Sequence, residues 1–270
     1  MRGGVWRYPR RVAQQGKAEA TRHVRLRIFG EERTFEVPAR RGPMRVTDLF
    51  EPARVLSERI AELSRIEGTA NGKRVSCKAG CGACCRQLVP ISTIEAKRLA
   101  TVVAAMPAPR RDEVRARFVA ATRRLEEVGL LDPRARGRAG LVRDDTPDES
   151  DWENVSRRYW EAELDCPFLE EGSCSIYEER PLVCREFSVT SDPRFCAERA
   201  PEIRALPRPV RMGDALAAAA HATTGVQARQ LPLTLSLEWS SHNGAPLART
   251  PDGGALLDAL VAAIVIEDED

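Results

Sequence analysis

Cysteine is the residue type that most limits what this chain can fold into, because its eight copies are concentrated in two short series. The first series, CKAGCGACC, contains Cys77, Cys81, Cys84 and Cys85. The second series begins about 80 residues later as CPFLEEGSCSIYEERPLVCREF and contains Cys166, Cys174 and Cys184, and Cys196 follows it. In the CGAC segment, two intervening residues allow a tight turn to direct two thiolates at one ion, about 2.3 Å from each sulfur. The spacing therefore predicts that thiolates from both series meet around bound zinc or iron.

The number of cysteines leaves the number of metal sites open. Four cysteines from each series fit two four-coordinate sites, or one cluster and a smaller site. Cys84 and Cys85 are adjacent, so their side chains tend to diverge, which favours more than one ion. A centre of four thiolates around zinc has a net charge of about −2, which needs nearby donors. The candidates are all basic residues close to cysteines in the sequence: Lys78, Arg86, Arg180 and Arg185.

A disulfide framework is the main alternative use of the cysteines. A chain of 270 residues can bury a core large enough to fold without crosslinks. Arg10 and Arg11 are not followed by an apolar run, so we expect neither an ordinary secretory signal nor a twin-arginine signal. We therefore expect a cytoplasmic protein, and the cytoplasm keeps thiols reduced and available to metal.

Composition argues against two classes of partner. The 42 basic and 40 acidic residues leave a formal charge of only +2, which provides no general attraction for nucleic acid or an anionic membrane. Aromatic residues are 5% of the chain, which is few for a protein that stacks on bases. The apolar run at residues 255–266 is interrupted by Asp258 and is too short to span a bilayer. We expect metal ions as partners, with no membrane and no nucleic acid, and the sequence identifies no protein partner.

Hydrophobic periodicity predicts a mainly α protein, with a small irregular helical domain centred on metal and an N-terminal β-hairpin appendage. The hairpin is expected at residues 23–38. Ser92 and Glu95 form a capping box at the start of one predicted helix. The predicted helices cover residues 46–66, 92–105, 107–130, 152–164, 212–224 and 252–266. Residues 131–151 are expected to be a mobile surface loop, and residues 231–239 fit a strand or a helix.

Three domains follow from this organisation. Residues 1–70 are predicted to hold the hairpin and a helical extension. Residues 71–200 are predicted to form the metal-binding domain, with a helical hairpin inserted between the two cysteine series. Residues 201–270 are predicted to form a C-terminal helical extension.

The cysteine series together resemble a known family. CKAGCGACC, followed by the IYEERPLVCREF string and Cys196, resembles the CxxCxxCC zinc- or iron-chelating domain of the YkgJ-like cysteine-cluster proteins. The resemblance covers about residues 77–196 and implies metal binding by all eight cysteines. Three residues, not two, separate Cys77 from Cys81, which departs from the family pattern. Flagellin lysine methylases have a similar cysteine cluster, so an iron–sulfur-dependent protein lysine methyltransferase is the enzymatic alternative, although the sequence has no cofactor-binding motif that supports it.

Other enzymatic interpretations have weaker support. Cys77, Cys81 and Cys84 spell CxxxCxxC, the pattern of radical S-adenosylmethionine enzymes, but that motif should follow the first strand of a β/α barrel, and here a helix precedes it. The three histidines are far apart in the sequence. A site filled by four thiolates has no open coordination position. We therefore expect a structural, storage or sensing role in preference to catalysis, with no catalytic residue assigned.

Overall fold

The structure is a computed structural model that describes residues 20–70, 72–141, 149–226 and 230–266. In chain order its α-helices are α1 (Phe50–Thr69), α2 (Thr93–Ala104), α3 (Arg110–Glu127), α4 (Glu149–Glu161), α5 (Leu182–Glu186), α6 (Pro193–Glu198), α7 (Met212–Thr224), α8 (Ser236–Asn243) and α9 (Gly253–Ala262). Its strands are β1 (Ala20–Ile28), β2 (Glu31–Ala39), β3 (Pro90–Ile91), β4 (Leu169–Glu170), β5 (Ser173–Cys174) and β6 (Leu231–Pro232). The prediction of a mainly α protein with an N-terminal hairpin is confirmed.

The hairpin of β1 and β2 is antiparallel, with Val24 opposite Phe35. Its two-residue turn contains Phe29 and Gly30, both with positive φ. Alternate side chains on its inner face are buried, as the alternating sequence pattern requires. That face packs against α1 and α9, so the hairpin contributes to the core.

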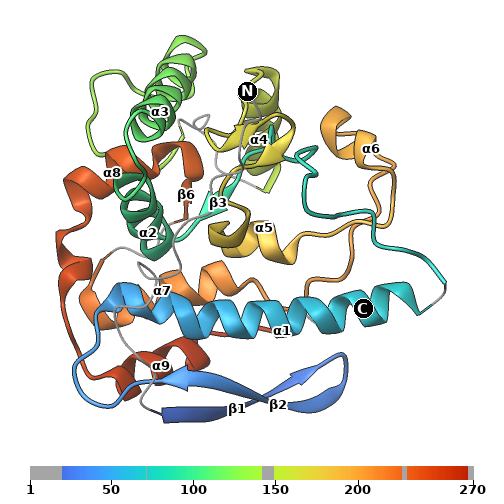
Figure 1. Ribbon diagram of the computed structural model, residues 1–270, viewed down its shortest axis with the longest axis vertical. Coiled ribbons are helices and arrows are strands. Elements are labelled where there is room, and N and C mark those ends of the chain that lie inside the picture. Colours follow the sequence, from blue (N-terminus) through green and yellow to red (C-terminus); the bar gives the residue numbers. More distant parts are fainter. Residues whose placement is uncertain (1–19, 71, 142–148, 227–229, 267–270) are drawn as a thin grey trace.

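The long helix α1 runs across the molecule between this hairpin on one side and α5 and α7 on the other (Figure 1). Its inward residues recur at helical spacing, and Leu56 and Ile60 are buried among them. A short 3-10 helix, η1 (Val46–Leu49), leads into it. The hydrophobic core is one cluster of buried residues that extends from the hairpin to α9. Contacts therefore cross both proposed domain boundaries, and the division into three domains stays a prediction.

The middle of the chain is joined to its C-terminal part. The short strand β3 pairs antiparallel with β6, and α2 packs against α8. Helix α2 begins with the predicted capping box, in which Ser92 and Glu95 hydrogen-bond each other's backbone N–H. The segment that fitted a strand or a helix contains both, because β6 is followed by a 3-10 turn, η3 (Leu233–Leu235), and then by α8.

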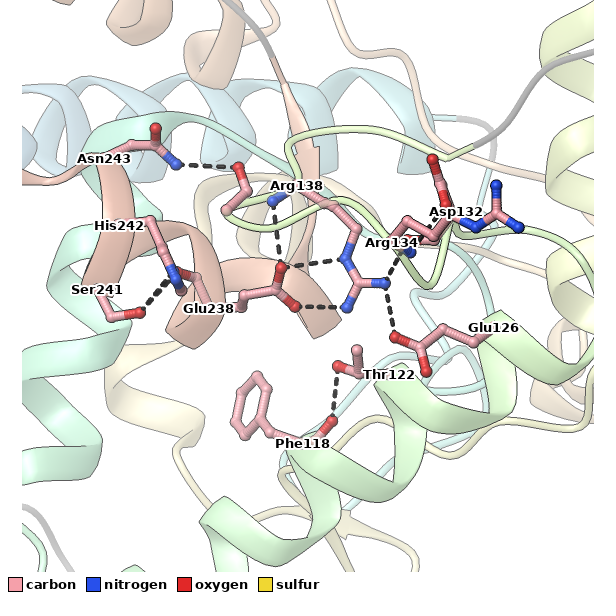
Figure 2. Close-up of polar contacts among 11 residues, drawn as sticks. Phe118, Thr122, Glu126, Asp132, Arg134, Arg138, Glu238, Ser241, His242 and Asn243 are labelled. Carbon is pink, nitrogen blue, oxygen red and sulfur yellow. Dashed lines mark hydrogen bonds and ion pairs between the residues drawn. The ribbon is translucent and has the colours of Figure 1, made fainter.

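The segment after α3 was predicted to be a mobile surface loop, but its described part holds a buried cation. Arg138 donates from Nε and Nη2 to the Glu238 carboxylate, at 3.0 and 2.7 Å (Figure 2). Its Nη1 donates to Glu126 at 2.6 Å and to the Asp132 carbonyl at 2.9 Å. Arg138 thus fastens the segment to α3 and α8, while the segment itself is irregular and exposed at residues 132–134, as expected of a surface loop. Residues 142–148 of that predicted loop lie outside the described residues.

No helix in the described part of the chain is both long and apolar enough to cross a membrane.

Candidate metal centre

The first cysteine series lies on a chain of consecutive tight turns. Cys81 N donates to the Lys78 carbonyl at 3.1 Å, Cys85 N to the Gly82 carbonyl at 3.0 Å, and Gln87 N to the Cys84 carbonyl at 3.1 Å. Gly80 has φ of +90°, a backbone conformation that side chains disfavour. The glycines therefore permit the local turns that bring four cysteines onto one short loop. We call residues 76–87 the cysteine loop.

The second series is presented by three different elements. Cys166 precedes β4, and Cys174 ends β5 opposite Leu169 in the small β4–β5 hairpin. Leu169 N donates a hydrogen bond to the Cys166 carbonyl at 2.8 Å, and this turn fixes Cys166 to the hairpin. Cys184 lies in α5 and Cys196 in α6. Three elements must therefore be held in place for these thiols to converge.

The structure brings the cysteine loop against the segment before β4, against α6 and against the segment that joins α5 to α6. Cys166 N donates to the Cys85 carbonyl at 2.7 Å, which joins the two series directly. The Gln87 side chain donates from Nε2 to the Cys196 carbonyl at 2.8 Å. On the other side of the loop, Val189 N donates to the Cys77 sulfur at 3.3 Å. Series that are about 80 residues apart in the sequence are thus neighbours in the fold.

Gly82 allows the closest approach between the loop and the β4–β5 hairpin. A Cβ atom at this position would lie 2.5 Å from the Gly172 carbonyl oxygen and 2.5 Å from Leu169 Cδ1. Both distances are too short for any side chain. Gly82 therefore permits both the local turn and the close packing of the cysteine loop on the hairpin. The packing role could not be predicted from the sequence.

Each of the eight cysteines is a free thiol in the structure. Burial raises the pKa of Cys166 to about 12 and of Cys196 to about 11, and it also raises the pKa of Cys77, Cys174 and Cys184. Backbone N–H groups of Phe168 and Ile176 partly oppose this effect at Cys166 and Cys174. A charged thiolate is therefore costly here unless a cation accompanies it.

Cys84 and Cys85 behave differently from each other. A hydrogen bond with Cys85 lowers the pKa of Cys84 to about 7, and the same contact raises the pKa of Cys85. Cys84 is also the thiol whose charge acts on the largest number of other cysteines, in both series. The adjacent pair thus lies where the two series meet.

The short helix α5 is fixed from its first residue by a buried carboxylate. Glu95 accepts the Leu182 N–H at 2.8 Å, and its other oxygen completes the capping box of α2. Later in α5, Glu186 accepts from the Ser57 hydroxyl at 2.9 Å, and burial raises the pKa of this carboxyl to about 7. Sequence reasoning found the capping box but missed these contacts to α5, because each joins residues 87 or more positions apart.

The four basic residues predicted to lie near the metal differ in their surroundings. The Arg180 Cζ atom lies over the Tyr177 ring, 4.0 Å from the ring centroid. The charge of Arg180 lowers the pKa of four thiols and so partly opposes the effect of burial, at Cys77, Cys84, Cys174 and Cys184. Arg185 is buried and pairs with Glu58 at 2.6 Å. Arg86 pairs with Asp165 on the surface, and Lys78 is exposed. Arg180 therefore has the electrostatic contact with both cysteine series that a charge-compensating residue requires.

The donor set suits a thiophilic metal, because sulfur ligands favour zinc and iron over calcium or magnesium. The Arg180 Nε atom is buried without a hydrogen-bond partner and remains available as a donor. Among residues 20–70, 72–141, 149–226 and 230–266, no three His, Cys, Asp or Glu side chains already take an arrangement that could hold an ion. Metal binding would therefore require the thiols to rotate toward common points.

Comparison with known proteins identifies one family. The family model of CxxCxxCC, described as "Putative zinc- or iron-chelating domain", matches residues 76–202. No curated protein and no solved structure matches the chain. The matched segment begins just before Cys77 and ends just after α6, so it contains all eight cysteines and every element that presents them. Residues 76–202 of this chain are therefore similar to the CxxCxxCC domain.

Proposed function

We propose that this protein binds zinc or iron through Cys77, Cys81, Cys84, Cys85, Cys166, Cys174, Cys184 and Cys196, in a structural, storage or sensing role. The observation that carries the proposal is the hydrogen bond from Cys166 N to the Cys85 carbonyl, at 2.7 Å, which joins the two cysteine series. The CxxCxxCC match over residues 76–202 supports the same class of ligand. Iron could be held as ions or as a cluster with sulfide.

The electrostatics of the thiols favour a cation as the ligand. Burial keeps most of these groups protonated near neutral pH, because it raises their pKa. A bound divalent metal supplies the positive charge that stabilises thiolates, so binding releases protons and strengthens as pH rises. The reducing cytoplasm is the compartment we propose, since it keeps thiols available.

A structural role follows from where the cysteines lie. They belong to the cysteine loop, the β4–β5 hairpin, α5 and α6, which are all short segments. A metal bound by thiolates from several of them would hold these elements together, as closed zinc sites do in other small folds. Four-thiolate ligation leaves no open position at the metal, so we assign no catalytic residue.

Serine substitution tests the ligand assignment. We expect Cys84→Ser and Cys184→Ser in the full chain to lower both the metal content and the thermal stability of the protein. The matched control is Val183→Thr, a half-buried neighbour of Cys184 in α5 where a methyl group becomes a hydroxyl. Metal content equal to wild type in both cysteine variants, measured by elemental analysis, would contradict the assignment.

A further inference from the structure

The two strands of the N-terminal hairpin meet the rest of the molecule differently. The backbone of β2 lies against α1 and α9, whereas β1 lies on the side of the hairpin away from α1 (Figure 1). The sheet has two strands, so the outer side of β1 is an edge. A strand at an edge has backbone N–H and C=O groups that no neighbouring strand in the sheet satisfies. The edge of β1 is therefore a surface on which another strand can pair.

The turn of the hairpin determines which backbone groups of β1 face this edge. Phe29 and Gly30 both have positive φ, and the pair of Ile28 and Glu31 closes this two-residue turn. The closing pair of such a turn exchanges hydrogen bonds, and bonded and non-bonded pairs then alternate along the ladder. The backbone groups that point away from β2 therefore belong to Thr21, His23, Arg25 and Arg27. Among the described residues, no backbone hydrogen bond joins any of these four to another segment.

The same edge is basic. Strand β1 contains three arginines and a histidine, and it contains no acidic residue. Arg22 forms an ion pair with Asp258 of α9. Arg25 is exposed, has the uncharged Thr34 as its cross-strand neighbour, and forms no ion pair with the described carboxylates. An acidic residue on an added strand, placed opposite Arg25, would therefore stabilise the pairing.

The surrounding sequence adds to this charge. Residues 1–45 contain 12 basic and 4 acidic residues, although the whole chain contains 42 and 40. The small net charge of the chain thus conceals a basic N-terminal part, and such a concentration of charge attracts anionic partners. Residues 1–19, which precede β1, contain five basic residues and one acidic residue. They have the same charge as the edge and do not complement it.

A second copy of the chain is a poor match for this edge. Two copies of β1 related by a two-fold axis would pair antiparallel. The arrangement that pairs all nine residues of the strand places Arg25 opposite His23, and the neighbouring arrangements place Arg25 opposite Arg25 or His23 opposite His23. Like charges directly opposite each other destabilise a pair of strands. The charge of the edge therefore disfavours self-association and favours a strand of opposite charge.

We propose that the outer edge of β1 binds an extended acidic segment of a partner protein as an added β-strand. The outward N–H and C=O groups of β1 supply the backbone hydrogen bonds, and Arg25 with the neighbouring basic side chains selects acidic residues on the incoming strand. This inference involves no cysteine, so it stands or falls separately from metal binding.

A synthetic peptide of alternating glutamate and threonine, with the same length as β1 and a fluorescein label, is the probe. Its binding to the full chain is measured by fluorescence polarisation. Arg25→Pro removes an outward N–H without removing a hydrogen bond to β2. Arg25→Thr removes the charge and keeps the N–H. Thr34→Pro is the matched control, because Thr34 is the partner of Arg25 and lies on the opposite edge of the hairpin.

We expect Arg25→Pro to weaken binding by about tenfold, because it removes one hydrogen bond and one exposed ion pair. Arg25→Thr should weaken binding by about threefold, the effect of the ion pair alone. Thr34→Pro should bind as the wild type does, and a peptide of alternating lysine and threonine should not bind. Equal binding by the wild type and Arg25→Pro would overturn the proposal, and so would a wild-type chain that does not bind the acidic peptide.

Hydrogen exchange of the wild-type chain, followed by NMR, keeps the test decisive if a proline variant does not fold. Saturation with the acidic peptide should slow exchange of the outward amides of β1 and leave that of Thr34 unchanged. Exchange that does not slow in β1 would refute the added strand.

Two other occupants can be detected with the same variants. Single-stranded DNA that binds as tightly as the peptide, and equally well to Arg25→Pro, would show a general surface for polyanions. A dimer in sedimentation that Arg25→Pro abolishes would show that a second copy occupies the edge. Either result would overturn the proposal.

Discussion

Four basic residues were predicted from the sequence to lie near the metal. Of these four, Arg180 is the one whose charge lowers the pKa of thiols in both cysteine series. Because its guanidinium lowers the pKa of Cys77, Cys84, Cys174 and Cys184, its removal raises the pKa of all four thiols. Metal competes with protons for the thiolates, so the midpoint of metal binding should move to higher pH. We expect Arg180→Gln to shift that midpoint upward by about 1 pH unit.

Cobalt absorbance measured as a function of pH would show this shift directly. Arg86→Gln is the matched control, because Arg86 is exposed and pairs with Asp165. It should leave the midpoint unchanged. An equal shift in both variants would mean that general positive charge, and not the position of Arg180, sets the metal affinity.

Gly82 is the residue where packing between the two series is closest. In Gly82→Ala the new Cβ would lie 2.5 Å from the Gly172 carbonyl oxygen, so the cysteine loop or the β4–β5 hairpin must move. We expect a loss of about 1–3 kcal/mol in the free energy of unfolding, the usual cost of overpacking. Gly140→Ala is the control, since a Cβ there meets no atom within 4 Å. Urea unfolding of both variants measures the difference, and equal stability would contradict the close approach.

At the scale of elements, α3 is attached to the hairpin that contains Cys174. Glu170 of β4 accepts from both Arg110 and Arg117, each at 2.9 Å. Arg117 also donates to the Pro167 carbonyl at 3.1 Å, and Phe118 packs edge-on against Phe168 with ring centroids 5.4 Å apart. Helix α3 thus forms a support for the β4–β5 hairpin.

Removing the shared carboxylate should loosen this support. We expect Glu170→Gln to lower the free energy of unfolding by about 1–2 kcal/mol, because both ion pairs are partly buried. Hydrogen exchange should become faster in α3 and in β4–β5. Glu127→Gln, which alters an exposed pair with Arg124 in the same helix, should have little effect. Unchanged exchange in Glu170→Gln would show that the two ion pairs of Glu170 do not hold α3 against the hairpin.

Elements with strong local signals could be predicted from the sequence. Helix α7 has the predicted bounds, because its alanine-rich run ends at Gly225, which has a positive φ. The capping box of α2 could be predicted because Ser92 and Glu95 are only three residues apart in the sequence. The two-residue strands β3 and β6 could not be predicted, since two residues show no periodicity and their pairing joins distant segments.

At the scale of the whole molecule, the cysteine spacing predicted a site but could not show how the site is assembled. The contact of Glu95 with Leu182 and the burial of Arg138 both depend on how distant segments pack. No local pattern in the sequence specifies such contacts. The segment that the CxxCxxCC model matches is also not isolated, because α5 packs on α1 and β3 pairs with β6, both partners lying outside residues 76–202. Metal bound by the cysteines would therefore affect the stability of the entire fold.

The most direct test of the central claim is the metal content of the full chain purified without oxygen, measured together with its ultraviolet and visible spectrum. Thiolate-bound metal predicts zinc at about two equivalents in a colourless solution, or iron with a broad band at about 400 nm. In either case a strong chelator should remove the metal and lower the melting temperature. A folded, metal-free protein whose eight cysteines all react freely with a thiol reagent would contradict the account.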